Sequence, residues 1–368
     1  MDGGDAAPRF TMLETVREFA LERLADTSLE EVIRRRHAQF YLELAERSEP
    51  CLRGEEQSTW LQRLEEEHDN LRVALRWALD HDVANIGLPL VGSLRWFWTL
   101  RSHVNEGYEW ARVMLEQSEA GRATAARAKA LWTAGVMAWF QQDPVARDLL
   151  EESVAAWRRE GGEERGLGYA LQHLGLVVSS EGEHSSARLL EEESLELFQR
   201  AGDTHGIALA TLCLAFIMTK LHEVEISQVL LQESAQLSRE IGDRWNLALT
   251  LGNQGRLGNA SGDYAEGCAL LAQSIYLWGE LGTKHEIVRV LNELGEWAHE
   301  RGDFRRATLV FGAVEAVSED IGVNPEDASH ASSLDRLRSV LREDHFATLW
   351  QEGRTAPLAQ ILDMPHPP

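Results

Sequence analysis

Cysteine is scarce in this sequence. Its 368 residues include only Cys51, Cys213 and Cys268, which lie far apart and form no C-x-x-C pair. An odd number of scattered cysteines indicates neither a disulfide framework nor a cysteine-based metal site. Two of the three lie in apolar helical runs, where a thiol behaves as a small buried hydrophobe. We therefore predict free thiols, no bound metal and a reducing, cytoplasmic location.

Long hydrophobic runs are also missing. The apolar stretches are short and are interrupted by Arg, Glu or Gly, whereas a membrane-spanning helix needs roughly 20 apolar residues in succession. Residues 1–8 are polar and acidic and lack the apolar segment of a secretion signal. We therefore expect no membrane partner and a disordered start to the chain.

Basic residues are too few to balance the acidic ones. Lysine and arginine total 36 against 60 aspartates and glutamates, and the formal net charge is −24. Such a surface repels phosphate backbones, so direct nucleic-acid binding is not expected. The densest basic stretch, residues 34–36, shares a helix with Glu30 and Glu31 and is typical of a solvated helix face. The composition favours a protein or peptide partner, or a small-molecule effector.

The motifs of common enzyme classes are absent. The sequence contains no G-x-x-x-x-G-K-[ST], H-E-x-x-H or G-x-S-x-G, and the glycine-rich stretch 252–258 lacks the phosphate-binding lysine. His68-Asp69, His81-Asp82 and His299-Glu300 are adjacent pairs, whose side chains point in different directions on a helix. We predict that the chain is not an enzyme and uses no cofactor. An enzyme of small molecules would need a pocket with converging, perturbed ionisable groups.

What the sequence does contain is an internal repeat with a unit of about 40 residues. In four units a leucine precedes a serine by four positions, and a glycine follows that serine eight positions later. The four sets are Leu149, Ser153 and Gly161; Leu190, Ser194 and Gly202; Leu230, Ser234 and Gly242; Leu270, Ser274 and Gly282. Each unit reads as two amphipathic helices, for example 168–180 and 185–201, joined by a glycine turn at 181–183. Neither helix can bury its apolar stripe alone, so neighbouring units must stack.

This repeat resembles the tetratricopeptide repeat. Leu174-Gly175 and Leu294-Gly295 match the signature pair of its first helix, and Ala187 and Ser194 fall where that family places small residues. The unit is longer than that of the family, which has about 34 residues. Most aromatic and proline positions of the consensus are missing. The resemblance implies an all-α, right-handed solenoid of six or seven tetratricopeptide-like helix pairs, each of about 40 residues. We assign the array to residues 91–322, an N-terminal helical segment to 28–90, and capping helices with a tail to 323–368.

The same resemblance implies a binding groove, because the first helix of each unit lines the concave face in that family. Carried onto this chain, the groove positions are Tyr169, Gln172, Ser179, Phe216, Thr219, Lys220, Leu249, Arg256, Asn259, Arg289, Asn292, Glu296 and His299. Lys220, Arg256 and Arg289 would stand on one wall of an acidic protein. They would either capture a carboxylate or acidic peptide, or form ordinary salt bridges between helices.

Three further segments resemble bacterial signal-transducing NTPases with numerous domains (STAND). Residues 9–20 are similar to the exit from their winged-helix region, 60–72 to the helix that follows, and 94–98 with Trp110 to their first repeat. In that family a nucleotide-binding module and a winged helix precede a helical sensor array, and a LuxR- or AfsR-type DNA-binding domain is often attached. The resemblance implies that residues 1–27 include a winged-helix remnant and that the NTPase and DNA-binding domains lie outside this chain.

The leading hypothesis is therefore the sensor and protein-interaction module of a bacterial transcriptional regulator. The alternative is a free-standing peptide-binding scaffold with no ATPase or DNA-binding partner domain. Four of the twelve tryptophans, Trp96, Trp98, Trp132 and Trp139, concentrate in the first half of the chain. They form either an aromatic core between units or a ligand pocket near the first repeats.

The N-terminal segment carries two helical patterns. One amphipathic helix is expected over 59–80, and another from Ser28 to about Arg47, with Ser28 and Glu31 as a capping box.

Overall fold

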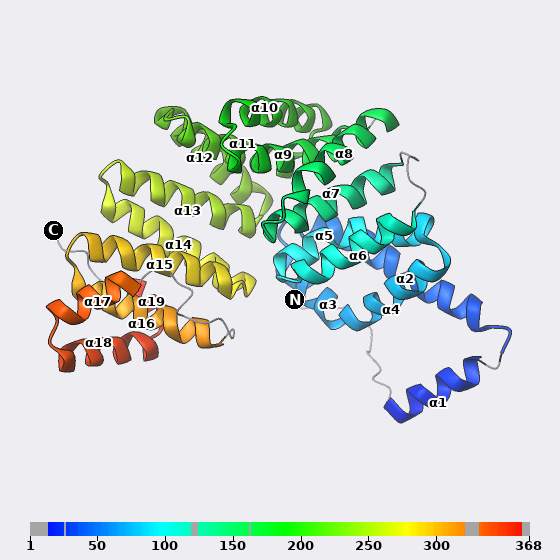
Figure 1. Cartoon of the computed structure of the whole chain (residues 1–368), viewed down its shortest axis with the longest axis horizontal. Helices are drawn as coiled ribbons and strands as arrows, with labels where there is room; N and C mark the ends of the chain where they lie inside the picture. Colours follow the sequence, from blue (N-terminus) through cyan, green and yellow to red (C-terminus); the bar gives the residue numbers. More distant parts are fainter. Residues whose placement is uncertain (1–13, 26, 119–123, 162, 321–330, 363–368) are drawn as a thin grey trace, which may run out of the picture.

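A computed structural model of the chain describes residues 14–25, 27–118, 124–161, 163–320 and 331–362. All regular structure in these ranges is helical, and the helices form a right-handed solenoid of stacked pairs (Figure 1). The predicted all-α solenoid is thereby confirmed. No helix in the described part of the chain has the length and apolarity needed to cross a bilayer.

The helices fall into an N-terminal group, six pairs and a C-terminal group. The N-terminal group contains α1 (Glu14–Ala25), α2 (Glu30–Cys51), α3 (Gln57–Glu66), α4 (His68–His81) and the π-helical turn η1 (Val83–Gly87). The pairs are α5 (Leu88–Leu100) with α6 (Val104–Gln117), α7 (Ala125–Phe140) with α8 (Val145–Glu160), α9 (Glu164–Ser180) with α10 (His184–Ala201), α11 (Thr204–Lys220) with α12 (Val224–Ile241), α13 (Arg244–Ala260) with α14 (Tyr264–Leu281), and α15 (Lys284–Glu300) with α16 (Phe304–Asp320). The C-terminal group contains α17 (Ala331–Val340), α18 (Glu343–Thr355) and α19 (Leu358–Leu362).

The N-terminal group differs from the sequence-based expectation in two details. The single helix expected over 59–80 is broken at Glu67, whose carboxylate accepts hydrogen bonds from Tyr41 Oη at 2.8 Å and Asn70 Nδ2 at 2.7 Å. These contacts hold the junction between α3 and α4 against α2. The Ser28–Glu31 capping box is also wrong, because α2 begins at Glu30 and its cap residue is Leu29. Residues 14–25, within the start expected to be disordered, form helix α1, while residues 1–13 lie outside the described ranges.

The repeated serines explain the spacing of the units. Ser194 Oγ donates a hydrogen bond of 2.9 Å to the carbonyl oxygen of Gly168, which lies on the first helix of the same pair. The equivalent bonds join Ser153 to Ala128 at 2.7 Å, Ser234 to Ala208 at 2.8 Å and Ser274 to Ala248 at 2.7 Å. All four serines are buried, so a larger side chain would push the paired helices apart. The serine repeat is thus a repeated bond between helices.

The turns inside the pairs recur once in every unit, and all adopt positive φ. Three carry glycine, at Gly182, Gly262 and Gly302. At the corresponding positions of the other pairs stand Ser102 (φ 60°), Gln142 (φ 58°) and His222 (φ 64°). The left-handed conformation brings Cβ close to the backbone and is unfavourable for residues other than glycine. Half of the six turns therefore hold a strained residue.

Replacing His222 by glycine is expected to stabilise the chain by about 0.5–1 kcal/mol, because it relieves this strain at a turn that glycine already occupies in three other pairs. The free energy of unfolding, measured by urea denaturation, should rise. Glu223→Gly is the matched control, since Glu223 has φ −90° and gains nothing from glycine. Equal effects of the two substitutions would contradict the prediction.

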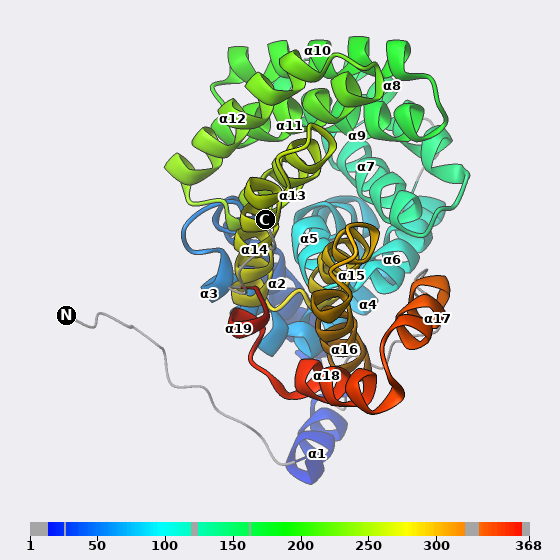
Figure 2. The ribbon, with the colours of Figure 1, turned by 90° about the vertical axis from the view of Figure 1, so that its left-hand side faces the viewer.

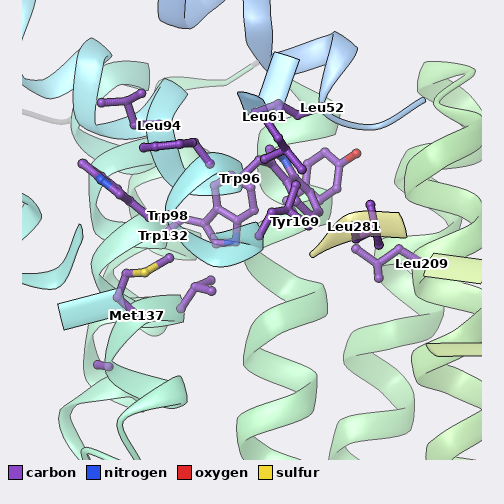
Figure 3. Packing of buried hydrophobic residues seen from close by; sticks show 14 of the residues in the cluster. Leu52, Leu61, Leu94, Trp96, Trp98, Trp132, Met137, Tyr169, Leu209 and Leu281 are labelled. Atoms are coloured by element: carbon purple, nitrogen blue, oxygen red, sulfur yellow. The ribbon is translucent and has the colours of Figure 1, made fainter. Parts of the chain in front are cut away.

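The array curves so far that its later pairs face its first pair. Figure 2 shows α5 inside an arc formed by α7, α9, α11 and α13, with α8, α10 and α12 on the outer side. Rings at the centre belong to distant parts of the chain: Trp96 of α5 lies 5.0 Å from His205 of α11 and 6.3 Å from Trp245 of α13, between ring centroids. In Figure 3, Leu61 of α3 and Leu209 of α11 approach the same cluster. The concave face is therefore partly filled by α5 and by Leu61 of α3.

One buried acid stands out in the convex layer. Glu191 of α10 is fully buried, and neither of its carboxylate oxygens has a hydrogen-bond partner. Burial raises its pKa well above 4.5, because no nearby cation compensates for the lost hydration. The side chain is therefore protonated in the folded chain at pH values where it is ionised in the unfolded chain.

Glu191→Gln is expected to stabilise the chain increasingly as the pH rises. The folded-state pKa of Glu191 lies above its unfolded value, so the folded state retains the proton longer and the wild type loses stability above pH 4.5. The difference between variant and wild type should be smallest below pH 4.5. It should then grow by about 1.4 kcal/mol per pH unit until the folded-state pKa is reached. Urea denaturation from pH 4 to 8 measures it, and a difference independent of pH would contradict the assignment.

Candidate functional site

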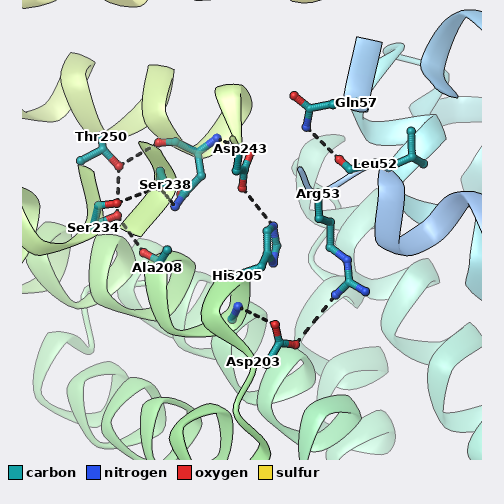
Figure 4. A network of polar contacts seen from close by, with 12 residues as sticks. Leu52, Arg53, Gln57, Asp203, His205, Ala208, Ser234, Ser238, Asp243 and Thr250 are labelled. Atoms are coloured by element: carbon teal, nitrogen blue, oxygen red, sulfur yellow. Dashed lines mark hydrogen bonds and ion pairs between the residues drawn. The ribbon is translucent and has the colours of Figure 1, made fainter. Parts of the chain in front are cut away.

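A buried polar network ties the N-terminal group to the concave face of the array. Arg53, just after α2, donates a hydrogen bond of 2.8 Å to Tyr169 Oη on α9 and lies 3.9 Å from Asp203 (Figure 4). Tyr169 Oη also lies 3.1 Å from Asp203 Oδ2 and 2.8 Å from His205 Nδ1. The Nε2 atom of His205 is 3.2 Å from Asp243 Oδ2, at the start of α13. The network thus joins three successive pairs to the segment after α2.

Asp203 is the centre of this network. It caps α11 by accepting a hydrogen bond from Gly206 N at 3.2 Å, and it accepts a second from Arg165 Nε at 2.8 Å. Burial alone would raise the pKa of Asp203, but the hydrogen bonds from Arg165 and Gly206 and the charges of Arg53 and Arg165 lower it below its ordinary value. Asp203 is therefore ionised at neutral pH and holds two arginines from different parts of the chain.

A cavity of about 330 Å³ lies on the concave face beside this network. The first helices of all six pairs, α5, α7, α9, α11, α13 and α15, contribute to its lining. Most of the lining is apolar and includes Trp96, Trp139, Leu176, Leu209, Leu212 and Trp245. A volume of this order suits a small molecule, and an apolar lining with a few polar groups is typical of ligand sites.

Arg95 forms the charged part of the cavity wall. It is 1% exposed, and its guanidinium carbon lies 3.5 Å from the ring centroid of Trp96 and 4.2 Å from that of Trp132. Its Nε and Nη2 atoms are buried without a hydrogen-bond partner, and no carboxylate among the described residues forms a salt bridge with it. Burial lowers the pKa of Arg95 to about 9, so the guanidinium keeps its charge at neutral pH. A buried, unpaired cation therefore faces a mostly apolar cavity.

Two further polar groups in the cavity wall lack partners. Trp96 Nε1 has no acceptor, and Gln172 Oε1 has no donor, although Gln172 Nε2 lies 3.0 Å from Cys213 Sγ. His173 also lines the cavity. Burial and the nearby charge of Arg95 lower the pKa of His173 well below 6.5, so it is neutral at pH 7. Arg95 is therefore the charged group of the deep part of the cavity.

The arginines at the rim are neutralised by glutamates. Arg256 Nη2 lies 2.9 Å from Glu293 Oε1, and Arg289 Nη1 lies 3.2 Å from the same oxygen. Arg289 also pairs with Glu286 at 2.6 Å. Two cations and two carboxylates leave the rim without net charge. Of the two interpretations of these arginines, the structure shows salt bridging.

The structure gathers five of the thirteen groove residues predicted from the sequence around one cavity: Gln172, Phe216, Leu249, Arg256 and Arg289. Tyr169 is buried behind the cavity in the polar network. The others lie on first helices outside the cavity lining: Ser179, Thr219, Lys220, Asn259, Asn292, Glu296 and His299. Lys220 Nζ is 5.2 Å from the ring centroid of Phe216, and Glu296 accepts a hydrogen bond from Ser333 Oγ of α17 at 2.7 Å.

The structure divides the tryptophans of the first half between the core and the wall of the cavity. Trp98 is 1% exposed and packs in the core beside Gly107. Trp132 is buried too, and its Nε1 lies 3.2 Å from His173 Nδ1. Trp96 and Trp139 instead contribute to the cavity wall. A hydrophobic pattern identifies all four as inward-facing but does not separate core from cavity.

Sequence reasoning missed Arg95, although one signal was available. Residues 88–100 form an apolar helix in which Arg95 is the only charged residue. An isolated charge inside a buried helix needs a partner or a function. Arg53 and His205 carried no comparable local signal, because their partners lie far away in the sequence.

One cluster in the described residues has the composition of a metal site. Suitable ligand atoms of Glu65, His68 and His103 lie within 4.8 Å of one another. His68 Nε2 also lies 3.2 Å from Glu106, whose carboxylate is bound by Arg72. Within the cluster, His103 Nε2 lies 3.2 Å from Glu65 Oε2, so each of its residues already has a charged or polar neighbour in the chain.

Comparison with curated proteins finds sequence similarity to transcriptional regulators that are named as putative. No family model matches it. Residues of the chain are 34% identical over 174 positions to the "Putative HTH-type transcriptional regulator Mb0914c" of Mycobacterium bovis and to the equivalent protein Rv0890c of Mycobacterium tuberculosis. Each match covers 45% of this chain and 20% of the relative, so the chain spans about a fifth of their length.

Among solved structures, a Rap protein complexed with Competence and Sporulation Factor aligns with 88% of this chain and 96% of its own, with a TM-score of 0.60 and 12% sequence identity. This likeness shows the fold alone. Together with the helix pairs it identifies the array as tetratricopeptide-like.

Proposed function

We propose that this chain is the sensor and protein-interaction region of a bacterial transcriptional regulator of the STAND class. In this proposal an effector binds in the concave groove and changes how the pairs pack around α5. The change is then passed to NTPase and DNA-binding domains outside the chain. The observation that carries the proposal is the cavity, because the first helices of all six pairs meet there.

The contacts of Trp96 support a coupling between the cavity and the packing of the N-terminal group on the array. Trp96 of α5 lines the cavity and also contacts His205 of the buried network, at 5.0 Å between ring centroids. A ligand that moves Trp96 would therefore disturb the contacts that hold the N-terminal group on the array. Packed interiors transmit such shifts because they contain few voids. The similarity to mycobacterial regulators supports the regulatory setting.

The test is a thermal-shift screen of the full chain against amino acids, nucleotides, sugars, carboxylic acids and short peptides, followed by hydrogen exchange on every hit. An effector should slow exchange in α5, α9 and α11. Cys213→Leu, which fills part of the cavity, should abolish the response. Cys268→Leu is the matched control, because Cys268 is also a buried thiol but lies outside the cavity. A hit that both variants bind equally well would contradict a role for the groove.

The regulatory part of the proposal is tested in the source organism. Strains carrying C213L or C268L in the chromosomal gene are compared by transcript profiling with and without the effector. We expect effector-dependent transcript changes in the wild-type and C268L strains and none in the C213L strain. Identical profiles in all three strains would contradict the proposal.

The second candidate is a free-standing peptide-binding scaffold. It is favoured by the similarity to a Rap protein solved in complex with Competence and Sporulation Factor. In that case peptides would be the only class of hits in the thermal-shift screen, and transcript profiles would not depend on them.

A further inference from the structure

We infer that the cavity binds a small molecule with one anionic group, such as a carboxylate, on an apolar body, and that Arg95 pairs with the anion. This inference rests on the proposed effector-binding function and names the chemical class of the effector. It follows from three features of the cavity: an unpaired cation, an apolar wall, and a rim without net charge.

The unpaired cation is the first feature. Arg95 is 1% exposed and forms no hydrogen bond through Nε or Nη2. A charge in this setting is unfavourable unless a partner supplies hydrogen bonds. The rings of Trp96 and Trp132 hold the guanidinium plane in place and offset part of that cost, but they leave its N–H groups unsatisfied. A carboxylate satisfies two adjacent N–H groups of a guanidinium at once.

The charge around Arg95 limits the ligand to one negative charge. Arg53 is occupied by Tyr169 and Asp203, while the nearby Glu49 is occupied by Lys129 at 2.5 Å. His173 is neutral, and the rim arginines are balanced by Glu286 and Glu293. Of the three arginines in the cavity lining, Arg95 is therefore the one without a carboxylate partner for a ligand to replace. A phosphate dianion or a nucleotide would bring more charge than this site and the acidic surface of the chain can neutralise.

The apolar wall determines the rest of the ligand. Leu176, Leu209 and Leu212 offer no hydrogen-bonding groups toward the body of a polar ligand such as a sugar. Flat or branched hydrocarbon groups fill such a space, and the burial of their apolar surface favours binding. The unpartnered Gln172 Oε1 can accept one hydrogen bond from a ligand donor. The predicted ligand is therefore an aromatic or branched carboxylic acid of modest size.

The experiment uses pairs of probes that differ only in charge. Phenylacetate, 3-phenylpropionate, indole-3-acetate and 4-methylpentanoate are each compared with the corresponding neutral amide by isothermal titration at pH 7.5. For the wild-type chain we expect at least one carboxylate to bind about 30-fold or more tightly than its amide, the size of one charge-assisted interaction. In Arg95→Met the same acid and amide should bind equally weakly. Arg95→Lys, which keeps the charge but loses the planar fork, should retain a smaller preference for the acid.

Two controls separate binding from folding. Arg127→Met removes another largely buried arginine that lies outside this cavity, and it should leave the acid-to-amide ratio unchanged. Arg95→Met should unfold at a temperature no lower than the wild type, because it removes a buried, unpaired charge. A structural arginine would show the reverse, with clear destabilisation on substitution.

The outcomes distinguish this inference from the proposed function. If R95M leaves the ratio of acid affinity to amide affinity unchanged, the pairing with Arg95 is wrong. If no acid binds while a sugar, nucleotide or peptide does and C213L abolishes its binding, this inference fails and the sensor function stands. If no compound class binds in a cavity-dependent way, both fail.

Discussion

Replacing Asp203 by alanine is expected to lower the free energy of unfolding by about 3–5 kcal/mol. Asp203 is 5% exposed and accepts hydrogen bonds from Arg165 Nε, Tyr169 Oη and Gly206 N. Alanine would remove the cap of α11 and leave the largely buried Arg53 without its carboxylate partner. Breaking a buried ion pair from one side is strongly destabilising because the remaining charge is not compensated. Urea denaturation at pH 7 measures the effect.

The pH dependence of the effect identifies its cause. The pKa of Asp203 is lower in the folded chain than its ordinary value of 3.8, so its contribution to stability is present above pH 3.8 and is lost as the pH falls through the folded-state pKa. Asp203→Asn keeps the shape and much of the hydrogen bonding but not the charge. The stability difference between wild type and D203N should therefore be constant from pH 5 to 8 and should shrink below about pH 4. A difference that persists unchanged at pH 3 would show that the charge is not what stabilises the network.

Gly353→Ala is expected to destabilise the C-terminal group by about 3 kcal/mol, at the upper end of the effect of overpacking. A Cβ atom at Gly353 of α18 would lie 2.0 Å from the carbonyl oxygen of Leu309 on α16. At the same crossing, a Cβ at Gly312 of α16 would lie 2.4 Å from the carbonyl oxygen of Trp350. Both obstacles are backbone atoms of packed helices, which cannot move without separating α18 from α16. Loss of this cap would expose the apolar end of the solenoid.

Limited proteolysis and urea denaturation test this prediction together. G353A should be cleaved first near α17 and α18 and should unfold at lower urea concentration than the wild type. Gly279→Ala is the matched control: Gly279 is exposed on α14, and a Cβ there meets no atom within 4 Å. Alanine at that position should stabilise the chain by about 0.5–1 kcal/mol, because glycine is unfavourable inside a helix. Similar destabilisation by both substitutions would refute the explanation from close backbone contact.

Much of the fold follows from local patterns in the sequence. Ser194 and its equivalents recur at a nearly constant spacing, and each forms the same bond between paired helices. Gly182 and its equivalents end helices with positive φ, as their position predicts. Such features depend on neighbours within one unit, so a comparison of the chain with itself reveals them. The turn at His222 shows the limit, because there the position in the repeat, and not the residue type, determines the conformation.

The candidate site could be predicted only in part. The repeat phase correctly placed Gln172, Phe216, Arg256 and Arg289 on the first helices, and the structure brings them around one cavity. It did not show that Arg256 and Arg289 share Glu293, since that contact depends on the spacing of two neighbouring pairs in space. The repeat phase also did not identify Arg95, because the tetratricopeptide pattern contains no position for a buried charge on the concave face.

The sequence by itself determined that the chain is a helical array with acidic surfaces, small residues at the helix crossings and no motif of the common enzyme classes. These properties depend on composition and on contacts within a single unit of the repeat. Only the tertiary structure decided that the array curves around α5, that Arg53 reaches Tyr169 from a distant part of the chain, and that Arg95 is buried without a partner. The physical reason is that small rotations between successive pairs add up over the whole array. The sum of these rotations determines which residues meet across the concave face, so no single unit reveals them.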